Sequence, residues 1–233
     1  MWESAVRCRL LMDWEGPLLD PGPGMLLALR RACLRAGRPL PVEEDLSWVL
    51  NTPLEGALEA LLGPGSEAER TQVMANIPVY FQRWGRYWCR EQAGARAMLG
   101  NLNEASSVET VLFSAETAPG VQTLLTHYDL ERSFDRILCA RRQACMQCKA
   151  ATAERLSRQC DPADRLLVWL TDDPRELRFA KYVGIPSIAA GWGRATPEEL
   201  EAEAPAMLAP EPHDVLRLLA GLGSAREPAV AVG

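Results

Sequence analysis

The order of strand and helix signals along the chain constrains its fold more than any other feature of the sequence. Short runs of apolar and β-branched residues occur at residues 6–12, 108–113, 136–139, 166–170 and 185–189. After the second run, amphipathic helical stretches separate them. Strands that alternate with helices form parallel sheets with helices on both faces. The sequence therefore predicts an α/β fold with a Rossmann-like parallel sheet.

The long stretch between the first two runs has helix signals and almost no strand signal. Residues 25–36 and 53–62 have the pattern of helices, and Ser66 with Glu69 has the pattern of a capping box that opens a third helix. We therefore predict an inserted helical cap domain at residues 22–92.

Length and composition agree with one large domain that carries such an insert. The chain has 233 residues, of which 48% are hydrophobic, so it can bury a sizeable core. We place the α/β core at residues 1–21 and 93–221. A tail rich in Gly, Ala and Val, residues 222–233, is predicted to be disordered.

Charge and hydropathy exclude several classes of partner. The net charge of −6 argues against a nucleic-acid partner, because neutralising phosphates requires clustered Lys and Arg. The beginning of the chain lacks a basic segment followed by an apolar one, and no apolar run approaches the ~20 residues of a membrane span. We therefore expect a cytoplasmic protein without a membrane partner, as a monomer or a homodimer.

The seven cysteines are expected to be reduced, since no secretion signal is present. Cys145 and Cys148 have the spacing of a redox pair or of half a zinc site, and Cys139 and Cys160 are near them in sequence. The gaps match no common zinc module, and the sequence has no second C-x-x-C pair. Unreactive thiols are the favoured interpretation, with a redox or metal role as the alternative.

Acidic and hydroxyl residues follow three of the predicted strands. Asp13 ends the first run, with Glu15 two residues later; Ser114 follows the second run, and Asp172 follows the fourth. The carboxyl ends of parallel strands meet at one edge of a sheet, where open α/β sheets bind ligands. We therefore expect these side chains to form a ligand site.

A lysine completes a pattern that is typical of one family. Lys149 precedes a helical stretch, residues 150–159, between the third and fourth runs. An aspartate, a hydroxyl, a lysine and an acidic cluster in this order resemble the four motifs of the haloacid dehalogenase (HAD) superfamily. The inserted helices, and Trp192 with Gly193 after the last run, extend the resemblance over most of the chain. It looks closest to phosphoglycolate phosphatase-like members, which carry a helical cap.

The resemblance implies a phosphatase mechanism. Asp13 would attack phosphorus to form an aspartyl-phosphate, which water then hydrolyses. Lys149 would neutralise charge on Asp13 and the phosphoryl group, and Ser114 would bind a phosphoryl oxygen. Asp13, Asp172 and the main-chain carbonyl of Glu15 would hold Mg²⁺. Glu15 would be the general acid and base, and the substrate would be a small phosphorylated metabolite.

Several positions depart from the family pattern. Glu15 stands where an aspartate is usual, and its extra methylene moves the carboxyl group by ~1 Å, which can cost ~10²-fold in rate. Pro17 replaces a threonine, Ala115 replaces a frequent asparagine, Thr171 replaces a glycine and Glu176 replaces an aspartate.

These departures leave two functions open. One is a Mg²⁺-dependent phosphatase, and the other is a catalytically impaired HAD-like protein that keeps the fold to bind a ligand or a partner. A dehalogenase is less favoured, because those relatives do not use Mg²⁺ and the acids of the fourth motif would have no evident task.

Two further patterns have interpretations of their own. Asp173 with Pro174 is a helix-start signal, so we expect Asp173 to cap a helix rather than to bind a metal. Arg83, Arg86 and Arg90 recur at helical spacing among aromatic residues in the predicted cap. This stripe is typical of a solvated helix face over an aromatic core, with contact to a substrate anion as the alternative.

Overall fold

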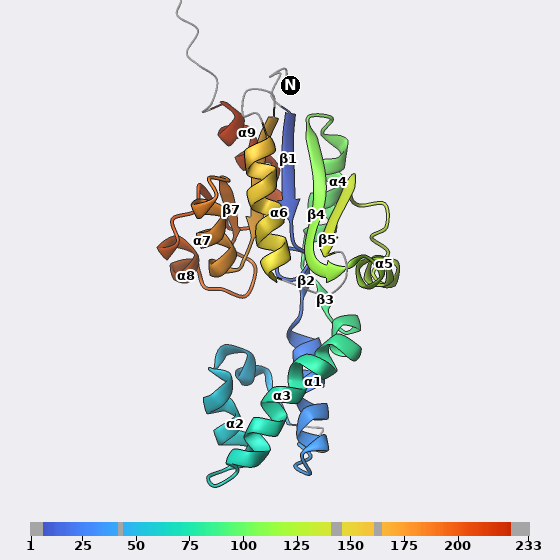
Figure 1. The fold of residues 1–233 in the computed structure, drawn as a ribbon, viewed down its shortest axis with the longest axis vertical. Coiled ribbons are helices and arrows are strands. Elements are labelled where there is room, and N and C mark those ends of the chain that lie inside the picture. The colour runs from blue at the N-terminus through green and yellow to red at the C-terminus, as the bar shows by residue number, and fades with distance from the viewer. Residues whose placement is uncertain (1–6, 42–43, 141–145, 161–164, 225–233) are drawn as a thin grey trace, which may run out of the picture. The chain divides into compact units, whose positions relative to one another are not determined.

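A computed structural model describes residues 7–41, 44–140, 146–160 and 165–224, and the chain divides into two compact units (Figure 1). One unit comprises Met1–Leu19 and Glu91–Gly233, and we call it the α/β unit. The other comprises Asp20–Arg90, and we call it the helical unit. Its bounds differ by two residues at each end from the predicted insert.

The α/β unit is built on a six-stranded sheet in the order β5-β4-β1-β6-β7-β8. Its strands are β1 (Arg7–Met12), β4 (Val108–Thr117), β5 (Arg136–Ala140), β6 (Arg165–Thr171), β7 (Ser187–Ala190) and β8 (Met207–Ala209). Every neighbouring pair in the sheet is parallel. The predicted α/β class is therefore confirmed, although the three-residue strand β8 is not among the predicted strands.

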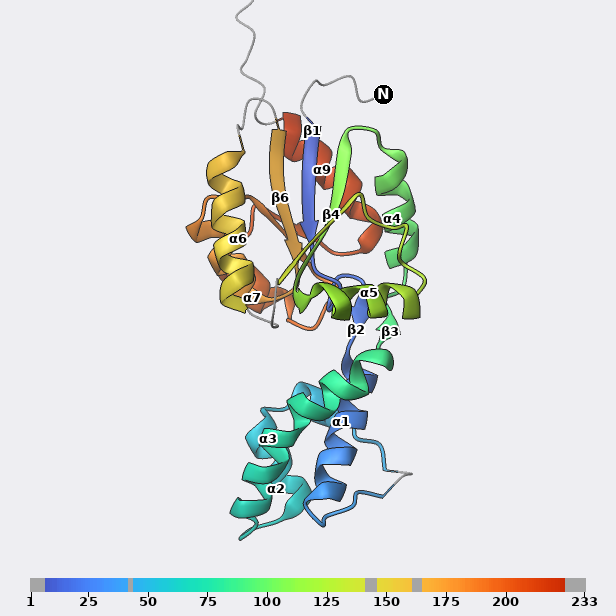
Figure 2. The same ribbon diagram turned by 45° about the vertical axis from the view of Figure 1, so that its right-hand side comes forward.

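Helices cover both faces of this sheet (Figures 1 and 2). They are α4 (Ala95–Glu104), α5 (Ala118–His127), α6 (Met146–Gln159), α7 (Pro174–Tyr182), α8 (Pro197–Ala202) and α9 (Val215–Ser224), with a 3₁₀ turn η3 (Pro212–Asp214). The two views place α4 and α9 on the opposite face of the sheet from α6. None of the described helices is both long and apolar enough to cross a bilayer.

The central strand β1 is buried on both faces, which explains its continuous apolar run. Leu11 packs in a cluster with side chains of β4 and β6, together with Ala153 of α6 and Ala180 of α7. Leu10 and Met12 alternate with Leu11 along the strand, so they point to the other face, and both are fully buried.

The helical unit has a core of its own. It contains α1 (Gly22–Arg35), α2 (Leu54–Leu62) and α3 (Glu67–Arg83), with 3₁₀ turns η1 (Ser47–Asn51) and η2 (Gly85–Tyr87). Buried residues of α1, α2 and α3 form one apolar cluster, which includes Leu29, Leu58 and Ile77. The chain enters this unit through β2 (Leu19–Asp20) and leaves through β3 (Arg90–Glu91), and these two strands pair.

Two predictions about segment ends were wrong. Ser66 precedes α3 but does not cap it; its hydroxyl donates to the Gly63 carbonyl at 2.6 Å instead. As an acceptor, the Ser66 oxygen bonds Arg70 Nη1 at 3.3 Å rather than a main-chain amide at the start of the helix. The predicted disordered tail begins at residue 222, whereas α9 continues through Ser224. Residues 225–233 lie outside the described part of the chain.

The prediction that Arg83, Arg86 and Arg90 share one helix face is wrong. Arg83 ends α3, Arg86 lies in η2, and Arg90 lies in β3, where it pairs with Asp20 at 2.8 Å. Beyond the end of α3, Gly85 packs against Gly24 of α1: a Cβ atom on Gly24 would lie 2.1 Å from the Gly85 carbonyl oxygen.

Two of the described cysteines, Cys8 and Cys33, fit the expectation of unreactive thiols. Burial raises the pKa of Cys8 to about 12 and that of Cys33 to about 11, so both are protonated at neutral pH. Cys145 and the side chain of Cys148 lie outside the described residues, so their alternative redox or zinc role stays a prediction.

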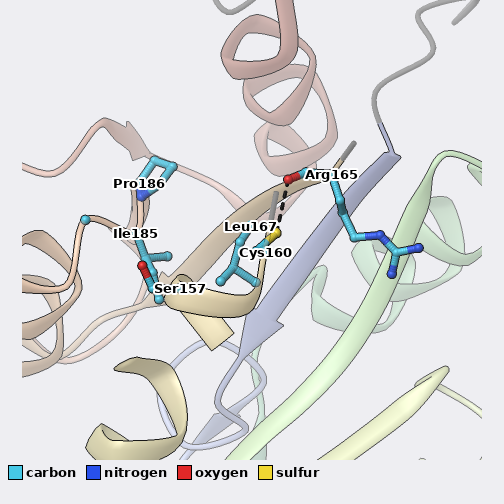
Figure 3. A pocket seen from close by; sticks show the side chains of 7 residues that line it. Ser157, Cys160, Arg165, Leu167, Ile185 and Pro186 are labelled. Atoms are coloured by element: carbon cyan, nitrogen blue, oxygen red, sulfur yellow. Dashed lines mark hydrogen bonds between the residues drawn. The ribbon is translucent and has the colours of Figure 1, made fainter. Parts of the chain in front are cut away.

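A small cavity of about 60 Å³ lies on the α6 and α7 face of the sheet (Figure 3). It is lined by Ser157, Cys160, Arg165, Leu167, Gly184, Ile185 and Pro186. Arg165 begins β6, so the cavity lies near the amino end of that strand. No residue of the predicted site lines this cavity.

Candidate active site

The predicted acids follow adjacent parallel strands at one edge of the sheet. β1 pairs in register with β4 and β6 as far as Met12. Asp13 comes next, level with the ends of these pairings, and Asp172 directly follows β6. The side chains of Asp13 and Asp172 therefore project from neighbouring strand ends.

Lys149 joins this edge from α6. We predicted that Lys149 precedes this helix. The helix in fact begins at Met146, so Lys149 lies within its first turn. The lysine side chain is only 1% exposed. Its Nζ donates to Asp13 Oδ2 at 2.5 Å and to Glu176 Oε1 at 2.7 Å. The structure thus brings Asp13 and Lys149, which are 136 residues apart in sequence, into direct contact.

The surroundings of Lys149 keep it charged. Burial alone would lower its pKa, but the attraction of Asp13 and Glu176 raises that pKa to about 12. The ammonium also lies 5.3 Å from the ring centroid of Phe113 and 5.6 Å from that of Trp169. Aromatic faces at this range attract a cation. Lys149 therefore supplies a fixed positive charge beside Asp13.

Glu176 lies beside these residues through its bond to Lys149, although it is not among the predicted site residues. It lies in the first turn of α7 and is buried. Burial raises its pKa, and Lys149 opposes this rise. The helix-start signal could have located it: Asp173 caps α7 as predicted, accepting from the Arg175 amide at 2.8 Å, and Glu176 follows within one turn of the cap.

Asp172 is enclosed by main-chain atoms. Its Oδ2 accepts from the Arg194 amide at 2.8 Å. A Cβ atom on Gly16 would lie 1.9 Å from Asp172 Oδ1, and one on Gly193 would lie 2.2 Å from its Cβ. Burial and the negative charge of Asp13 raise the pKa of Asp172 to about 6, while the amide of Arg194 opposes the rise. The two glycines therefore allow the loops to close around this carboxylate.

The loop that follows β1 is tied to the loop that follows β7. The Trp14 amide donates to Asp13 Oδ1 at 2.8 Å, and the indole N–H of Trp192 donates to the Pro17 carbonyl at 3.0 Å. Trp192 directly precedes Gly193, whose backbone lies against Asp172. This tie was not foreseen from the sequence, where Trp192 was noted only as part of the family resemblance.

We expect Trp192→Phe to lower the free energy of unfolding by about 1 kcal/mol, because it keeps an aromatic ring but removes the hydrogen bond to Pro17. Urea denaturation followed by circular dichroism measures the effect. Trp88→Phe is the matched control, since Trp88 is 66% exposed. Equal stability of the two variants would contradict a structural role for the tie.

Glu15 and Ser114 have different surroundings from those of Asp13. Glu15 is exposed, and its main chain forms an isolated bridge with Leu19. Ser114 is buried and its Oγ accepts from the Glu116 amide at 3.1 Å. It lies within β4, which continues past the predicted end of that strand. The hydrogen bonds described for Ser114 do not include Asp13 or Lys149.

The chemistry of the donor atoms suits Mg²⁺. No group of three or more His, Cys, Asp or Glu residues with metal-binding geometry occurs in the described part of the chain. Mg²⁺ needs fewer protein ligands, since it is usually held by one or two carboxylates and keeps several waters. Asp13, Asp172 and the main-chain oxygen of Glu15 fit this requirement. A cation here would also offset the repulsion between the two aspartates that contributes to the raised pKa of Asp172.

Comparisons with known proteins agree on the fold. No protein-family model matches the chain, and no curated protein sequence matches it. A haloacid dehalogenase-like hydrolase from Streptococcus pneumoniae is similar in structure, with 20% identity, a TM-score of 0.67, and coverage of 92% of this chain and 99% of that one. A predicted phosphoglycolate phosphatase from Haemophilus somnus has 15% identity, a TM-score of 0.64, and coverage of 93% and 99%.

One similar structure is described as a kinase rather than as a hydrolase or a phosphatase. Protein tyrosine kinase A from Mycobacterium tuberculosis has 21% identity, a TM-score of 0.58, and coverage of 86% of this chain and 100% of that one.

The similarity to the hydrolase and the phosphatase shows that the chain has the fold of the HAD-superfamily hydrolases. It confirms, for the fold, the resemblance inferred from the motifs. A shared fold does not by itself fix a reaction.

Proposed function

We propose that this protein is a Mg²⁺-dependent phosphatase of the HAD type that acts on a small phosphorylated metabolite. One observation carries the proposal: the buried ammonium of Lys149 bonds to Asp13 at the carboxyl edge of the sheet. A carboxylate beside a fixed positive charge, at the edge where α/β proteins bind ligands, suits attack on an anionic phosphoryl group.

The proposed reaction has two steps. A carboxylate oxygen of Asp13 forms a bond to phosphorus while the bond from phosphorus to the leaving oxygen breaks, and Glu15 donates a proton to that oxygen. A water molecule then attacks phosphorus and gives its proton to Glu15, which releases phosphate and restores Asp13. Lys149 stabilises the negative charge on Asp13 and the phosphoryl oxygens throughout.

The remaining roles follow from the fold and the donor atoms. Asp13, Asp172 and the main-chain oxygen of Glu15 would hold Mg²⁺, as HAD-superfamily phosphatases generally do use this ion. When bound, the ion would supply positive charge against the phosphoryl oxygens. We assign to Ser114 a hydrogen bond to one of these oxygens. We assign to the helical unit the role of a cap that selects the substrate.

A specific observation favours a second candidate function. The Glu15 side chain is exposed, and Pro17 replaces the usual threonine in the same loop. Either feature could weaken proton transfer to the leaving group. The alternative is thus a catalytically impaired HAD-like protein that binds a phosphorylated ligand or a protein partner.

Hydrolysis of an aryl phosphate by the purified protein tests the proposal. We expect turnover with Mg²⁺ that is lost with a chelator and lost in Asp13→Asn, because the amide cannot form the aspartyl-phosphate. Glu15→Asp is expected to raise kcat by ~10-fold, since it restores the usual length of the acid. Activity that survives in Asp13→Asn would refute this mechanism, and absence of activity in all variants would favour the binding function.

A further inference from the structure

Two of the departures from the family pattern are in direct contact. Thr171 stands where a glycine is usual, and Glu176 stands where an aspartate is usual. The Thr171 hydroxyl donates to Glu176 Oε2 at 2.8 Å. A glycine at position 171 would have no side chain to make this bond.

The hydroxyl of Thr171 has a defined direction. Its oxygen accepts from the Asp173 amide at 3.2 Å, so its own hydrogen is left to bond the Glu176 carboxylate. Thr171 is 1% exposed and Glu176 is 5% exposed, so water does not compete freely for either group. The hydrogen bond is therefore made in a low-dielectric interior, where it is stronger than in water.

The two carboxylate oxygens of Glu176 accept hydrogen bonds from different residues. Oε2 accepts from Thr171, whereas Oε1 accepts from Lys149 Nζ at 2.7 Å. Lys149 in turn donates to Asp13 at 2.5 Å. One continuous chain of hydrogen bonds thus runs from the Asp173 amide through Thr171, Glu176 and Lys149 to Asp13.

A glutamate needs such a partner more than an aspartate does. Its additional methylene adds one side-chain torsion, and each free torsion lets the carboxylate occupy more positions. Bonds to both oxygens fix that torsion, which a single bond to Lys149 would leave less restricted. The hydroxyl of Thr171 thus compensates for the longer acid.

We propose that Thr171 is a positioning residue, which acts through Glu176 to hold Lys149 against Asp13. The inference rests on the proposed function, since positioning Lys149 matters for the attack by Asp13. Thr171 itself is not assigned a contact with the substrate.

The sequence offers a direct readout of this role. It has only two lysines, Lys149 and Lys181, so a protein labelled with ¹³C at lysine Cε gives two signals, which Lys181→Arg assigns. We expect Thr171→Val to shift the Lys149 signal and to leave that of Lys181 unchanged. It should also lower kcat by ~10-fold with KM changed by less than about twofold, the scale typical of partners behind a catalytic group.

Thr110→Val is the matched control. Thr110 is a fully buried threonine of β4, in the same sheet, and its hydroxyl bonds Asn103 and Asp135 rather than the site. We expect this variant to leave both the Lys149 signal and kcat unchanged. An unshifted Lys149 signal in Thr171→Val would overturn the proposal, as would an equal shift in Thr110→Val.

A double variant tests whether Thr171 acts through Glu176. Glu176→Asp alone shortens the acid and should lower kcat. Adding Thr171→Val to Glu176→Asp should cost no further factor, because the shortened acid already lacks the bond to the Thr171 hydroxyl. Independent, multiplicative losses would overturn the coupling. If the parent protein hydrolyses no phosphate, the lysine signals still decide the positioning role, while the proposed function alone fails.

Discussion

Replacing Lys149 with methionine is expected to lower kcat by ~10³-fold and the free energy of unfolding by ~3 kcal/mol. Methionine keeps the volume and removes the charge. The variant leaves Asp13 and the buried Glu176 without the ammonium that now bonds both. Removing one partner of a buried ion pair costs more than the pair contributes, because the remaining charges stay desolvated.

The loss of stability in Lys149→Met should depend on pH. Burial already raises the pKa of Glu176, and Lys149 opposes that rise, so the variant raises it further. A carboxyl group with a raised pKa in the folded state stabilises the fold below its unfolded pKa, and this contribution is lost as pH rises. The deficit should therefore be larger at pH 8 than at pH 5, as measured by urea denaturation with chelator present.

Lys181→Met is the matched control, because Lys181 is the other lysine of the chain and is exposed on α7. We expect it to retain kcat, with stability close to that of the parent at both pH values. If Lys149→Met lowers the free energy of unfolding equally at pH 5 and pH 8, then the loss does not come from leaving the carboxylates of Asp13 and Glu176 without the lysine charge.

Replacing Gly16 with alanine is expected to lower the free energy of unfolding by ~3 kcal/mol and to abolish most of the turnover. Two causes add. Gly16 has a φ of +94°, which costs a residue with a Cβ atom roughly 1–2 kcal/mol. Its Cβ would also lie 1.9 Å from Asp172 Oδ1, so the loop or the carboxylate must move.

Gly37→Ala separates these two causes. Gly37 also has a positive φ, +75°, but a Cβ there would meet no atom within 4 Å. We expect this control to lose only about 1 kcal/mol and to keep full activity. Binding of Mg²⁺ alone, measured by calorimetry, should weaken in Gly16→Ala and not in Gly37→Ala. Equal binding by the two variants would show that the contact between Gly16 and Asp172 does not shape the metal site.

Local signals were sufficient to predict the fold and part of the site. The apolar run up to Asp13 predicts a strand buried on both faces, and alternating helices require its neighbours to be parallel. The ends of parallel strands meet at one edge, so the order of the sequence already places Asp13 and Asp172 there. Asp173 caps α7 because a cap needs only the residues next to it.

Two predictions failed because the local pattern does not show which contacts the segment makes. The Ser66 hydroxyl bonds the Gly63 carbonyl instead of capping α3, although its spacing to Glu69 suits a capping box. The arginine stripe does not lie on one helix: α3 ends at Arg83, and the following Gly85 packs against Gly24 of α1, and periodicity within one segment reveals neither fact.

The sequence by itself determined the parallel sheet and the edge at which Asp13 and Asp172 lie, whereas the nucleophilic role of Asp13 stays a prediction. Only the tertiary structure decided what those groups contact. Lys149 meets Asp13 across 136 residues of chain and Glu176 across 27. These contacts depend on how α6 and α7 pack over the strands. Packing is a property of the whole core, whereas the cap that Asp173 forms depends only on the residues next to it.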